Sequence, residues 1–296
     1  MSRAKRKGAS NKSKIILLAL LVILIVSVVA AVLITNQTPI LPTPSPSSFT
    51  SSAWMSFVPA NAQGFEFLNL SFLYASYPSL FTSNLIRTLD QPALNITVQE
   101  VNYEVLTTIN NEGVYAYSID STDLSNIAGS LATANLTYDV YNNVTLYQIN
   151  ATGNMVWACI VHGGLVLTND SSSISELALQ SVVDSTQTSF FNNDSLKSGY
   201  LLDWEGTSTF AFSYEQSGTN TYNLNWAMLS LTSTSVVNER ITLNFPSSSV
   251  VSSEFNTAKS NLFPSGTSIY TSGSFLVGDY GFPLTQQGLG EALESI

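Results

Sequence analysis

The sequence has little of the residue types from which most catalytic and metal centres are built. Its 296 residues include one Cys and one His. A single Cys cannot form an internal disulfide bond, and one Cys with one His cannot complete a four-ligand zinc site. The sequence also lacks the Gly-x-Ser-x-Gly elbow, the phosphate-binding P-loop and the dinucleotide-binding glycine pattern. We therefore expect no catalysis, no cofactor and no metal ion.

Charge is scarce as well, and it is unevenly distributed. Only 10% of the residues are charged, compared with about 25% in ordinary globular domains. Six of the ten basic residues lie in the first fourteen positions, and all twenty acidic residues lie at or after Glu66. The chain after residue 34 has four basic and twenty acidic residues, a net charge of −16. Such a chain has no basic face for nucleic acid, so nucleic acid is excluded as a partner.

The segment Ile15–Ile34 is long and apolar, with Ser27 as its only polar residue. At about 1.5 Å per residue, a helix of this length spans the roughly 30 Å hydrocarbon core of a bilayer. The six basic residues of the first fourteen positions precede this segment, and no Lys or Arg follows it before Arg87. This distribution favours a cytoplasmic N-terminus. The sequence thus predicts a cell-membrane protein with a basic tail (1–14), one transmembrane helix (15–35) and its bulk outside the cytoplasm.

Two alternatives to an uncleaved anchor remain open at this point. A secretory signal peptide would be removed, although its apolar region is normally about 7–15 residues and ends in a small-residue cleavage site. The pair Lys7-Gly8 resembles the prepilin-type processing site of archaeal pilins and of some archaeal solute-binding proteins. In that class the apolar segment is kept after processing.

A stretch rich in Ser, Thr and Pro follows, from residue 36 to 53. Its four prolines favour extended polyproline II structure, so it is expected to form a stalk. Such a stalk behind one anchor resembles archaeal surface proteins. Asn-x-Ser/Thr motifs make the protein a candidate glycoprotein, with candidate sites at Asn36, Asn69, Asn95, Asn135, Asn143, Asn150, Asn169 and Asn193.

From Trp54 onward, hydrophobic periodicity alternates between that of strands and that of helices. The pattern predicts an α+β fold with antiparallel sheets and helices packed on one face. We expect two related lobes, 54–191 and 192–296. Within them we expect helices near 79–89, 120–131, 173–183, 249–262 and 284–296, and strands near 63–74, 95–108, 114–119, 200–204, 209–214, 223–231, 235–244 and 268–278. A hairpin is expected over 136–168.

One helix pattern is distinctive. Ser173 and Glu176 form a capping-box motif, and the core stripe of this helix is expected to be Ile174, Leu177, Ala178 and Val182.

Part of the chain resembles a known family. The sequence has Tyr141-x-x-Val144-x-Leu146-Tyr147, then Cys159 to Asn169 around a Gly-Gly pair, then Phe190-Phe191-Asn192-Asn193, with Pro59-Ala60 near its start. This pattern resembles the domain of unknown function 3352 type of membrane-anchored surface protein, over about residues 57–205. The resemblance implies an α+β surface domain and carries no catalytic residue with it.

Two constellations remain as candidates for chemistry. Cys159 and His162 are three residues apart, so on a strand they point to opposite faces, and Cys159 is expected to be a buried apolar residue. Asp203 and Glu205 flank Trp204, and on a strand both carboxylates would point to one side. Such a pair could serve a hydrolase or hold Ca²⁺, although two acids at this spacing are also common on a solvated strand.

The sequence therefore favours a single-pass surface protein that acts by protein–protein interaction, in a surface layer, an appendage or a membrane complex. The expected partners are the membrane, through Ile15–Ile34, and another protein at the cell surface. A receptor for a solute or a polysaccharide is the alternative, because the chain has 13 Tyr and 4 Trp, which can stack on sugars.

Overall fold

A computed structural model describes most of the chain after residue 51. The described residues are 52–76, 100–151, 154–192, 194–203, 209–216, 222, 224–233, 236–261, 263, 266–283, 285, 288–289 and 292. All of them belong to one compact unit, Ser48–Ile296. The predicted basic tail, the transmembrane segment and nearly all of the predicted stalk lie outside the described residues, as does the helix expected near 79–89.

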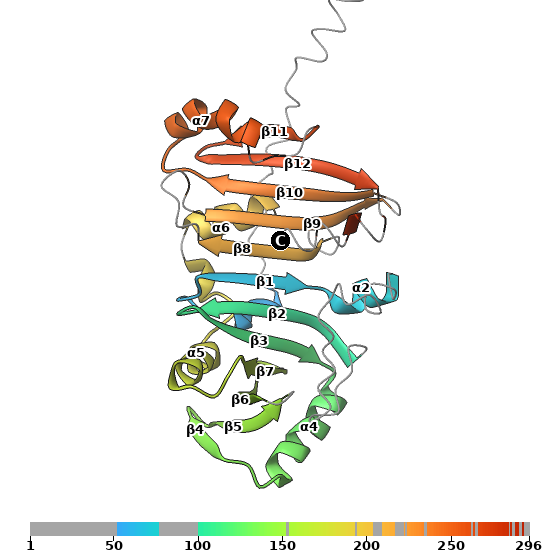
Figure 1. The fold of residues 1–296 in the computed structure, drawn as a ribbon, viewed down its shortest axis with the longest axis vertical. Coiled ribbons are helices and arrows are strands. Elements are labelled where there is room, and N and C mark those ends of the chain that lie inside the picture. Colours follow the sequence, from blue (N-terminus) through green and yellow to red (C-terminus); the bar gives the residue numbers. More distant parts are fainter. Residues whose placement is uncertain are drawn as a thin grey trace, which may run out of the picture. The chain divides into compact units, whose positions relative to one another are not determined.

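One twelve-stranded antiparallel sheet dominates the fold, with the order β11-β12-β10-β9-β8-β1-β2-β3-β7-β6-β5-β4 (Figure 1). The N-terminal strands are β1 (Gly64–Leu68), β2 (Val101–Ile109), β3 (Glu112–Ile119), β4 (Tyr138–Tyr141), β5 (Val144–Ala151), β6 (Asn154–Val161) and β7 (Gly164–Thr168). The C-terminal strands are β8 (Thr209–Gln216), β9 (Leu224–Ser233), β10 (Val236–Asn244), β11 (Ser268–Ser272) and β12 (Phe275–Pro283).

Tight turns keep neighbouring strands in register. Three hairpins have two-residue connections with positive φ at both residues: Asn110–Asn111, Asn142–Asn143 and His162–Gly163. Paired left-handed residues match the right-handed twist of the strands that they join, and Asn and Gly adopt this conformation most readily. The hairpin predicted over 136–168 is in fact four strands, β4 to β7, because two further turns divide it.

The strand β1 joins the two halves of the sheet. It pairs with β2 on one side and with β8 on the other, and both pairings are antiparallel. Strands from the N-terminal and C-terminal parts of the chain therefore form a continuous ladder. The predicted α+β architecture of two lobes with separate sheets is wrong, because the fold is a single sheet to which the helices are additions.

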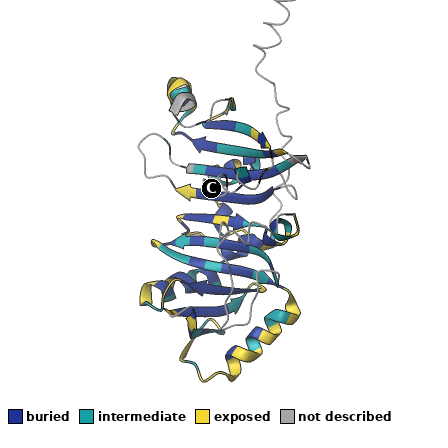
Figure 2. Cartoon of the chain, turned by 45° about the vertical axis from the view of Figure 1, so that its right-hand side comes forward, coloured by how far each residue is buried: buried dark blue, intermediate teal, exposed yellow. Residues whose placement is uncertain are grey.

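The two faces of the sheet are covered by different elements, which corrects the prediction that helices pack on one face only. The face that carries Phe65, Phe212 and Trp226, called here the aromatic face, is covered by η1 (Ala53–Phe57), α5 (Ser173–Val183), η3 (Phe190–Asn192) and α6 (Asp194–Asp203). The second face packs against α2 (Leu70–Ser76) and α4 (Ser121–Thr133). The strands are mostly buried, and the outer side of α4 is exposed (Figure 2). A further helix, α7 (Ser248–Asn261), packs its Val251 against residues of β10 and β12.

The expected boundaries of α4 are confirmed. Asp120 is the N-cap residue, and Ile127 and Leu131 are buried.

The cap of helix α5 lies one residue before the predicted capping box of Ser173 and Glu176, and the helix buries a different set of residues. Its N-cap is Ser172, whose hydroxyl accepts a hydrogen bond from the Ser175 backbone N–H. Ala178 and Val182 are buried as predicted, but Ile174 and Leu177 are 50% and 57% exposed. The predicted core stripe of this helix is wrong. The helix is rotated about its axis relative to the prediction, so that Ser175 and Leu179 take the inward positions.

The strand expected over 200–204 is also wrong. Residues 200–203 follow η3 and lie in the last turns of α6, which ends at Asp203. Tyr200 of this helix packs in the aromatic cluster against Phe191 and Phe212. The short apolar run around Tyr200 is compatible with a strand or a helix, and tertiary packing has selected the helix.

The predicted single-pass localisation in the cell membrane is corrected as well. No helix within the described part of the chain combines the length and the apolar character needed to cross a bilayer. The segment on which the prediction was based, Ile15–Ile34, is not among the described residues.

Candidate functional site

A pocket of about 460 Å³ lies over the middle of the sheet, on the second face. Its floor is formed by two rows of residues, each crossing β2, β1, β8 and β9 in register. One row is Thr108, Gly64, Glu215 and Asn225, and the next row is Leu106, Glu66, Ser213 and Ala227. With strands about 4.8 Å apart, this floor is about 14 Å wide. The volume falls within the range of small-molecule sites, about 300–1,000 Å³.

The rim of the pocket is held by hydrogen bonds. The backbone N–H of Asn111, in the β2–β3 turn, donates to Gln63 Oε1 over 2.9 Å. The backbone of Gln63 donates to Thr108 and accepts from Gln216. Three strands and one turn are thereby tied together where β1 begins, at the opposite end of β1 from α2 (Figure 1).

The pocket floor contains a polar group that is not satisfied by the described part of the protein. Asn225 Oδ1 is buried and has no hydrogen-bond partner there. Ser213, which also lines the pocket, is only 7% exposed. An unpaired buried polar group costs about 1–3 kcal/mol. A ligand that donates a hydrogen bond to Asn225 Oδ1 would recover that free energy.

The described lining of the pocket is acidic. Glu66 and Glu215 supply two carboxylates, and the described lining contains no Lys, Arg or His. Both acids are exposed. Among the described residues, no three His, Cys, Asp or Glu side chains come together as they would around a metal ion.

The aromatic residues at the pocket turn their rings away from it. Phe65 and Tyr214 contribute to its lining, but they are 2% and 5% exposed and pack in the aromatic cluster. Neighbouring residues of a strand point to opposite faces of the sheet, so these rings lie beneath the floor. Burial raises the pKa of Tyr214 to about 12. The pocket therefore offers polar and acidic groups without a stacking surface.

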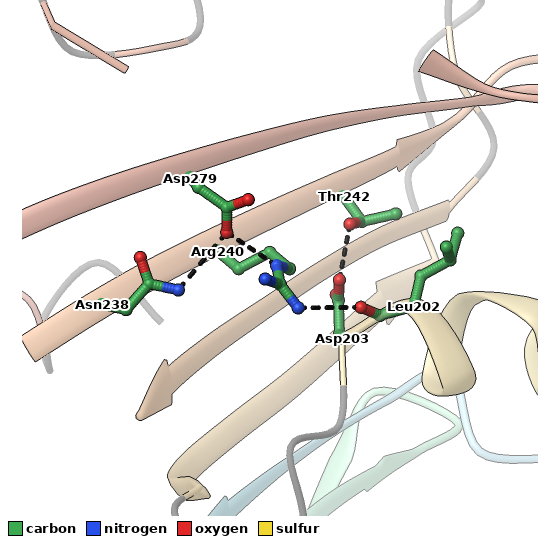
Figure 3. A network of polar contacts seen from close by, with 6 residues as sticks. All are labelled: Leu202, Asp203, Asn238, Arg240, Thr242 and Asp279. Carbon is green, nitrogen blue, oxygen red and sulfur yellow. Dashed lines mark hydrogen bonds and ion pairs between the residues drawn. The ribbon is translucent and has the colours of Figure 1, made fainter. Parts of the chain in front are cut away.

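Asp203, the first residue of the predicted carboxylate pair, lies elsewhere, on the aromatic face. It is fully buried, and its Oδ1 accepts a 2.6 Å hydrogen bond from Thr242 Oγ1 (Figure 3). Glu205 lies outside the described residues, as does Trp204 between the two acids. Because α6 ends at Asp203, strand geometry does not position this carboxylate.

A buried ion pair adjoins Asp203. Arg240 Nε donates to Asp279 Oδ1 over 2.7 Å, and a terminal guanidinium nitrogen of Arg240 donates to the Leu202 carbonyl over 3.0 Å (Figure 3). Burial lowers the pKa of Arg240, but the hydrogen bond and charge of Asp279 outweigh it, so the pKa is raised overall. The guanidinium thus ties the last turn of α6 to β10 and β12, and its role is structural.

Cys159 and His162 do not form a dyad. Cys159 is fully buried, and burial raises the pKa of its thiol to about 12. Its expected role as a buried apolar residue agrees with this position. His162 is exposed in the β6–β7 turn, where its Nε2 lies 2.9 Å from the Val182 carbonyl oxygen. The thiol has no basic partner in the part of the chain that the structure describes, and its raised pKa keeps it protonated at neutral pH.

The candidate glycosylation sites differ in accessibility. Asn135, Asn143, Asn150 and Asn169 are exposed. Asn69 is half-buried, and its Oδ1 accepts from the Phe72 N–H at the start of α2, so its amide already serves as a helix cap. Asn36, Asn95 and Asn193 are outside the described residues. Glycosylation stays a prediction.

Comparisons with known proteins identify no family. No family model matches the chain, and no curated protein is similar to it. Among solved structures, TP0453 in its crystal form I is similar, with a TM-score of 0.48 and 9% sequence identity over 83% of this chain and 98% of that chain. Similarity at this level carries no statement about activity or partners. The resemblance to the domain of unknown function 3352 stays a prediction.

Sequence analysis did not identify the pocket residues. Glu66, Glu215 and Asn225 lie in three separate strands, and none of them belongs to a recognisable motif. Alternation along each strand tells which residues share a face, but it does not tell which strands are neighbours. That information lies in the β1–β8 pairing, which joins residues about 150 positions apart.

Proposed function

We propose that this protein acts by binding a partner in the pocket over β2, β1, β8 and β9, and that it is not an enzyme. The observation that supports the proposal is the unsatisfied Asn225 Oδ1 on the pocket floor, beside the nearly buried Ser213. Folded proteins seldom leave buried polar groups without partners. A bound group that donates to Asn225 Oδ1 is the simplest physical reason for it to persist.

The same site offers little for catalysis. A nucleophile needs an adjacent base and an orienting group within hydrogen-bond reach. Ser213 has neither His nor Lys beside it in the described lining. The acids of the pocket floor therefore serve recognition in this proposal.

The hydrolase alternative based on Asp203 and Glu205 has less support. A glycosidase needs two carboxyl groups that face a substrate across a cleft, whereas Asp203 is fully buried. The polysaccharide receptor also has less support, because sugar binding favours exposed aromatic platforms. The described tryptophans are at most 6% exposed.

The test is site-specific photo-crosslinking of the full chain in its native cells. A photoreactive amino acid replaces Gln216, which is exposed at the pocket rim. The control position is Asn126, which is exposed on α4. We expect a discrete crosslinked species from position 216 and none from position 126.

A second substitution connects the crosslink to the pocket. Ser213→Leu fills the floor with an apolar side chain and should abolish the product from position 216. Ser125→Leu, on the exposed side of α4, is the matched control and should leave it unchanged. Melting temperatures of both variants establish that they are folded. A product that survives Ser213→Leu in a folded protein would refute the proposal.

A further inference from the structure

We infer that the outer edge of β4 is a self-association surface for a second copy of this chain, and that Asp139 keeps this surface closed. The inference is independent of the pocket. β4 (Tyr138–Tyr141) is the last strand of the sheet, and none of the described strands lies beyond it (Figure 1). Two of its residues, Tyr138 and Val140, are large apolar side chains that are 64% and 57% exposed.

The backbone of β4 presents hydrogen-bonding groups along this edge. In an antiparallel strand, residues that bond to the neighbouring strand alternate with residues whose N–H and C=O point away from it. The backbone N–H of Gln148, in β5, donates to the Thr137 carbonyl oxygen, so every second residue from Thr137 onward faces β5. The N–H and C=O groups of Tyr138 and Val140 therefore point outward, where they fit another extended strand.

The edge is held in place and has few of the features that prevent pairing. Tyr141 Oη donates to Asp184 Oδ2 over 2.5 Å, and Asn142 Nδ2 donates to Asp184 Oδ1 over 2.6 Å. Asp184 is the C-cap residue of α5, so these bonds tie the β4–β5 turn to that helix. Natural edge strands avoid pairing by means of proline, lysine or a bulge. β4 has neither residue, its pairing with β5 is regular, and Asp139 is its only charge.

The strand is complementary to a second copy that runs antiparallel to it. In one register, Tyr138 of each copy is directly opposite Val140 of the other. This register matches outward groups with outward groups, and each of the two residue pairs exchanges both of its backbone hydrogen bonds. Tyr138 and Val140 lie on the same face of the sheet because they are two residues apart. Aromatic and β-branched side chains are favourable cross-strand neighbours, so the exposed apolar residues would cover each other.

Asp139 opposes this pairing in two ways. Its Oδ1 accepts a 2.7 Å hydrogen bond from the Val140 backbone N–H, so the carboxylate takes the place that a carbonyl oxygen of the second copy would need. In the same register, Asp139 is also directly opposite Asp139 of the second copy, with the Cα atoms about 4.5 Å apart. Like charges in this position destabilise a strand pair. A strand without an acid at this position would not meet that repulsion, so the repulsion acts on copies of this chain in particular.

Sedimentation velocity of the full-length protein tests the role of Asp139. Asp139→Asn removes the charge but keeps an oxygen that can accept from the Val140 N–H, whereas Asp139→Thr removes the whole carboxylate. We expect Asp139→Thr to form dimers with a Kd at least about 10-fold lower than that of the unaltered protein, and Asp139→Asn to be intermediate. The matched control is Glu254→Gln in α7, which packs against β10 and β12 far from β4, and it should change nothing.

A proline separates strand pairing from non-specific association. Val140→Pro removes an outward N–H and leaves the bonds between β4 and β5 intact, which is the position where edge strands tolerate proline. Added to Asp139→Thr, it should restore the single-copy state with little change in melting temperature. Dimers that persist in this double variant, or larger species without a limit, would overturn the inference. An Asp139→Thr variant that stays single would also overturn it, and the edge would then be left to a strand of another protein.

Asp139→Cys reports the register directly. Two cysteines directly opposite each other across such a pair are within reach of a disulfide bond, and the native Cys159 is fully buried. With oxidised glutathione, we expect Asp139→Cys to form a disulfide-linked dimer. The comparison is Val140→Cys combined with Asp139→Thr, in which each new thiol would be opposite Tyr138 of the second copy and should link more slowly. Faster linkage through position 140 than through position 139 would refute the proposed pairing.

Discussion

Replacing Arg240 with Met tests whether the buried network on the aromatic face holds α6 to the sheet. The substitution keeps most of the side-chain length and removes the charge. It leaves the Asp279 carboxylate without its ion pair and the Leu202 carbonyl, in the last turn of α6, without its donor. Asp203, fully buried nearby, also loses a favourable charge. We therefore expect Arg240→Met alone to lower the free energy of unfolding substantially.

The magnitude follows from burial. Removing one partner of a fully buried ion pair costs about 3–5 kcal/mol, because the other charge is stranded. An exposed pair contributes only about 0–1 kcal/mol. The side chains of Arg240 and Asp279 are 12% and 18% exposed, so the lower end of the buried range applies. A loss of about 3 kcal/mol corresponds to a fall in Tm of about 6–12 °C for a domain of this size.

The change in unfolding free energy is measured by urea unfolding, with far-ultraviolet circular dichroism as the signal. Arg240→Lys keeps the charge but not the planar fork and should lose less than Arg240→Met. Adding Asp279→Asn to Arg240→Met removes the stranded charge and should recover part of the loss. A loss below about 1 kcal/mol, or no recovery in the double variant, would show that the pair acts as an exposed one and that our account of α6 docking is wrong.

Three further outcomes follow from buried or capped groups. The single Cys of the sequence, Cys159, should react with a thiol reagent in urea but not in the native protein, because it is fully buried and its pKa is raised to about 12. Labelling of the native protein at neutral pH would contradict the buried position of this thiol. Gly199→Ala should lower the free energy of unfolding by about 1–2 kcal/mol, because a Cβ at this position overlaps the Trp226 indole. The control is Gly129→Ala, whose added Cβ meets open space and should raise the free energy of unfolding by about 0.5–1 kcal/mol. Hydrogen bonds from the Ser175 side chain and the Ser172 backbone lower the pKa of Asp170 in the folded state. This stabilisation is present above the unfolded pKa of about 4 and is lost as pH falls through the folded value. The difference in unfolding free energy between the protein and its Asp170→Asn variant, measured by urea titration, should therefore shrink between pH 7 and pH 3.

Local patterns predicted individual elements well. The N-cap at Asp120 and the stripe containing Ile127 and Leu131 located α4, because one helix face meeting one core produces a clear period. The same method failed at α5. In α5, which packs over β3, β7 and β6, Ser175 takes an inward position because its hydroxyl bonds to Asp170 and Glu112. Hydrophobic periodicity does not detect a polar residue that is buried together with its hydrogen-bond partners.

Architecture was predicted poorly, for a reason that concerns pairing. Each hairpin is a local event, and short turns such as Asn110–Asn111 reveal it. The joining of the two halves through β1 and β8 is a non-local event, and no spacing in the sequence indicates it. Without that pairing, the chain resembles two smaller sheets, which is the arrangement that the sequence predicted.

The same non-local pairing creates the candidate site. Glu66 lies in β1, while Ser213 and Glu215 lie in β8, and they meet only because these two strands are neighbours. On separate sheets, each acid would be an exposed carboxylate on a solvated strand, which is the ordinary interpretation of such residues. Joined in one sheet, they line the same pocket as Asn225, whose Oδ1 is buried without a partner among the described residues. The joint between the two halves of the sheet is therefore the part of the molecule where the proposed binding should fail first when the β1–β8 register is disturbed.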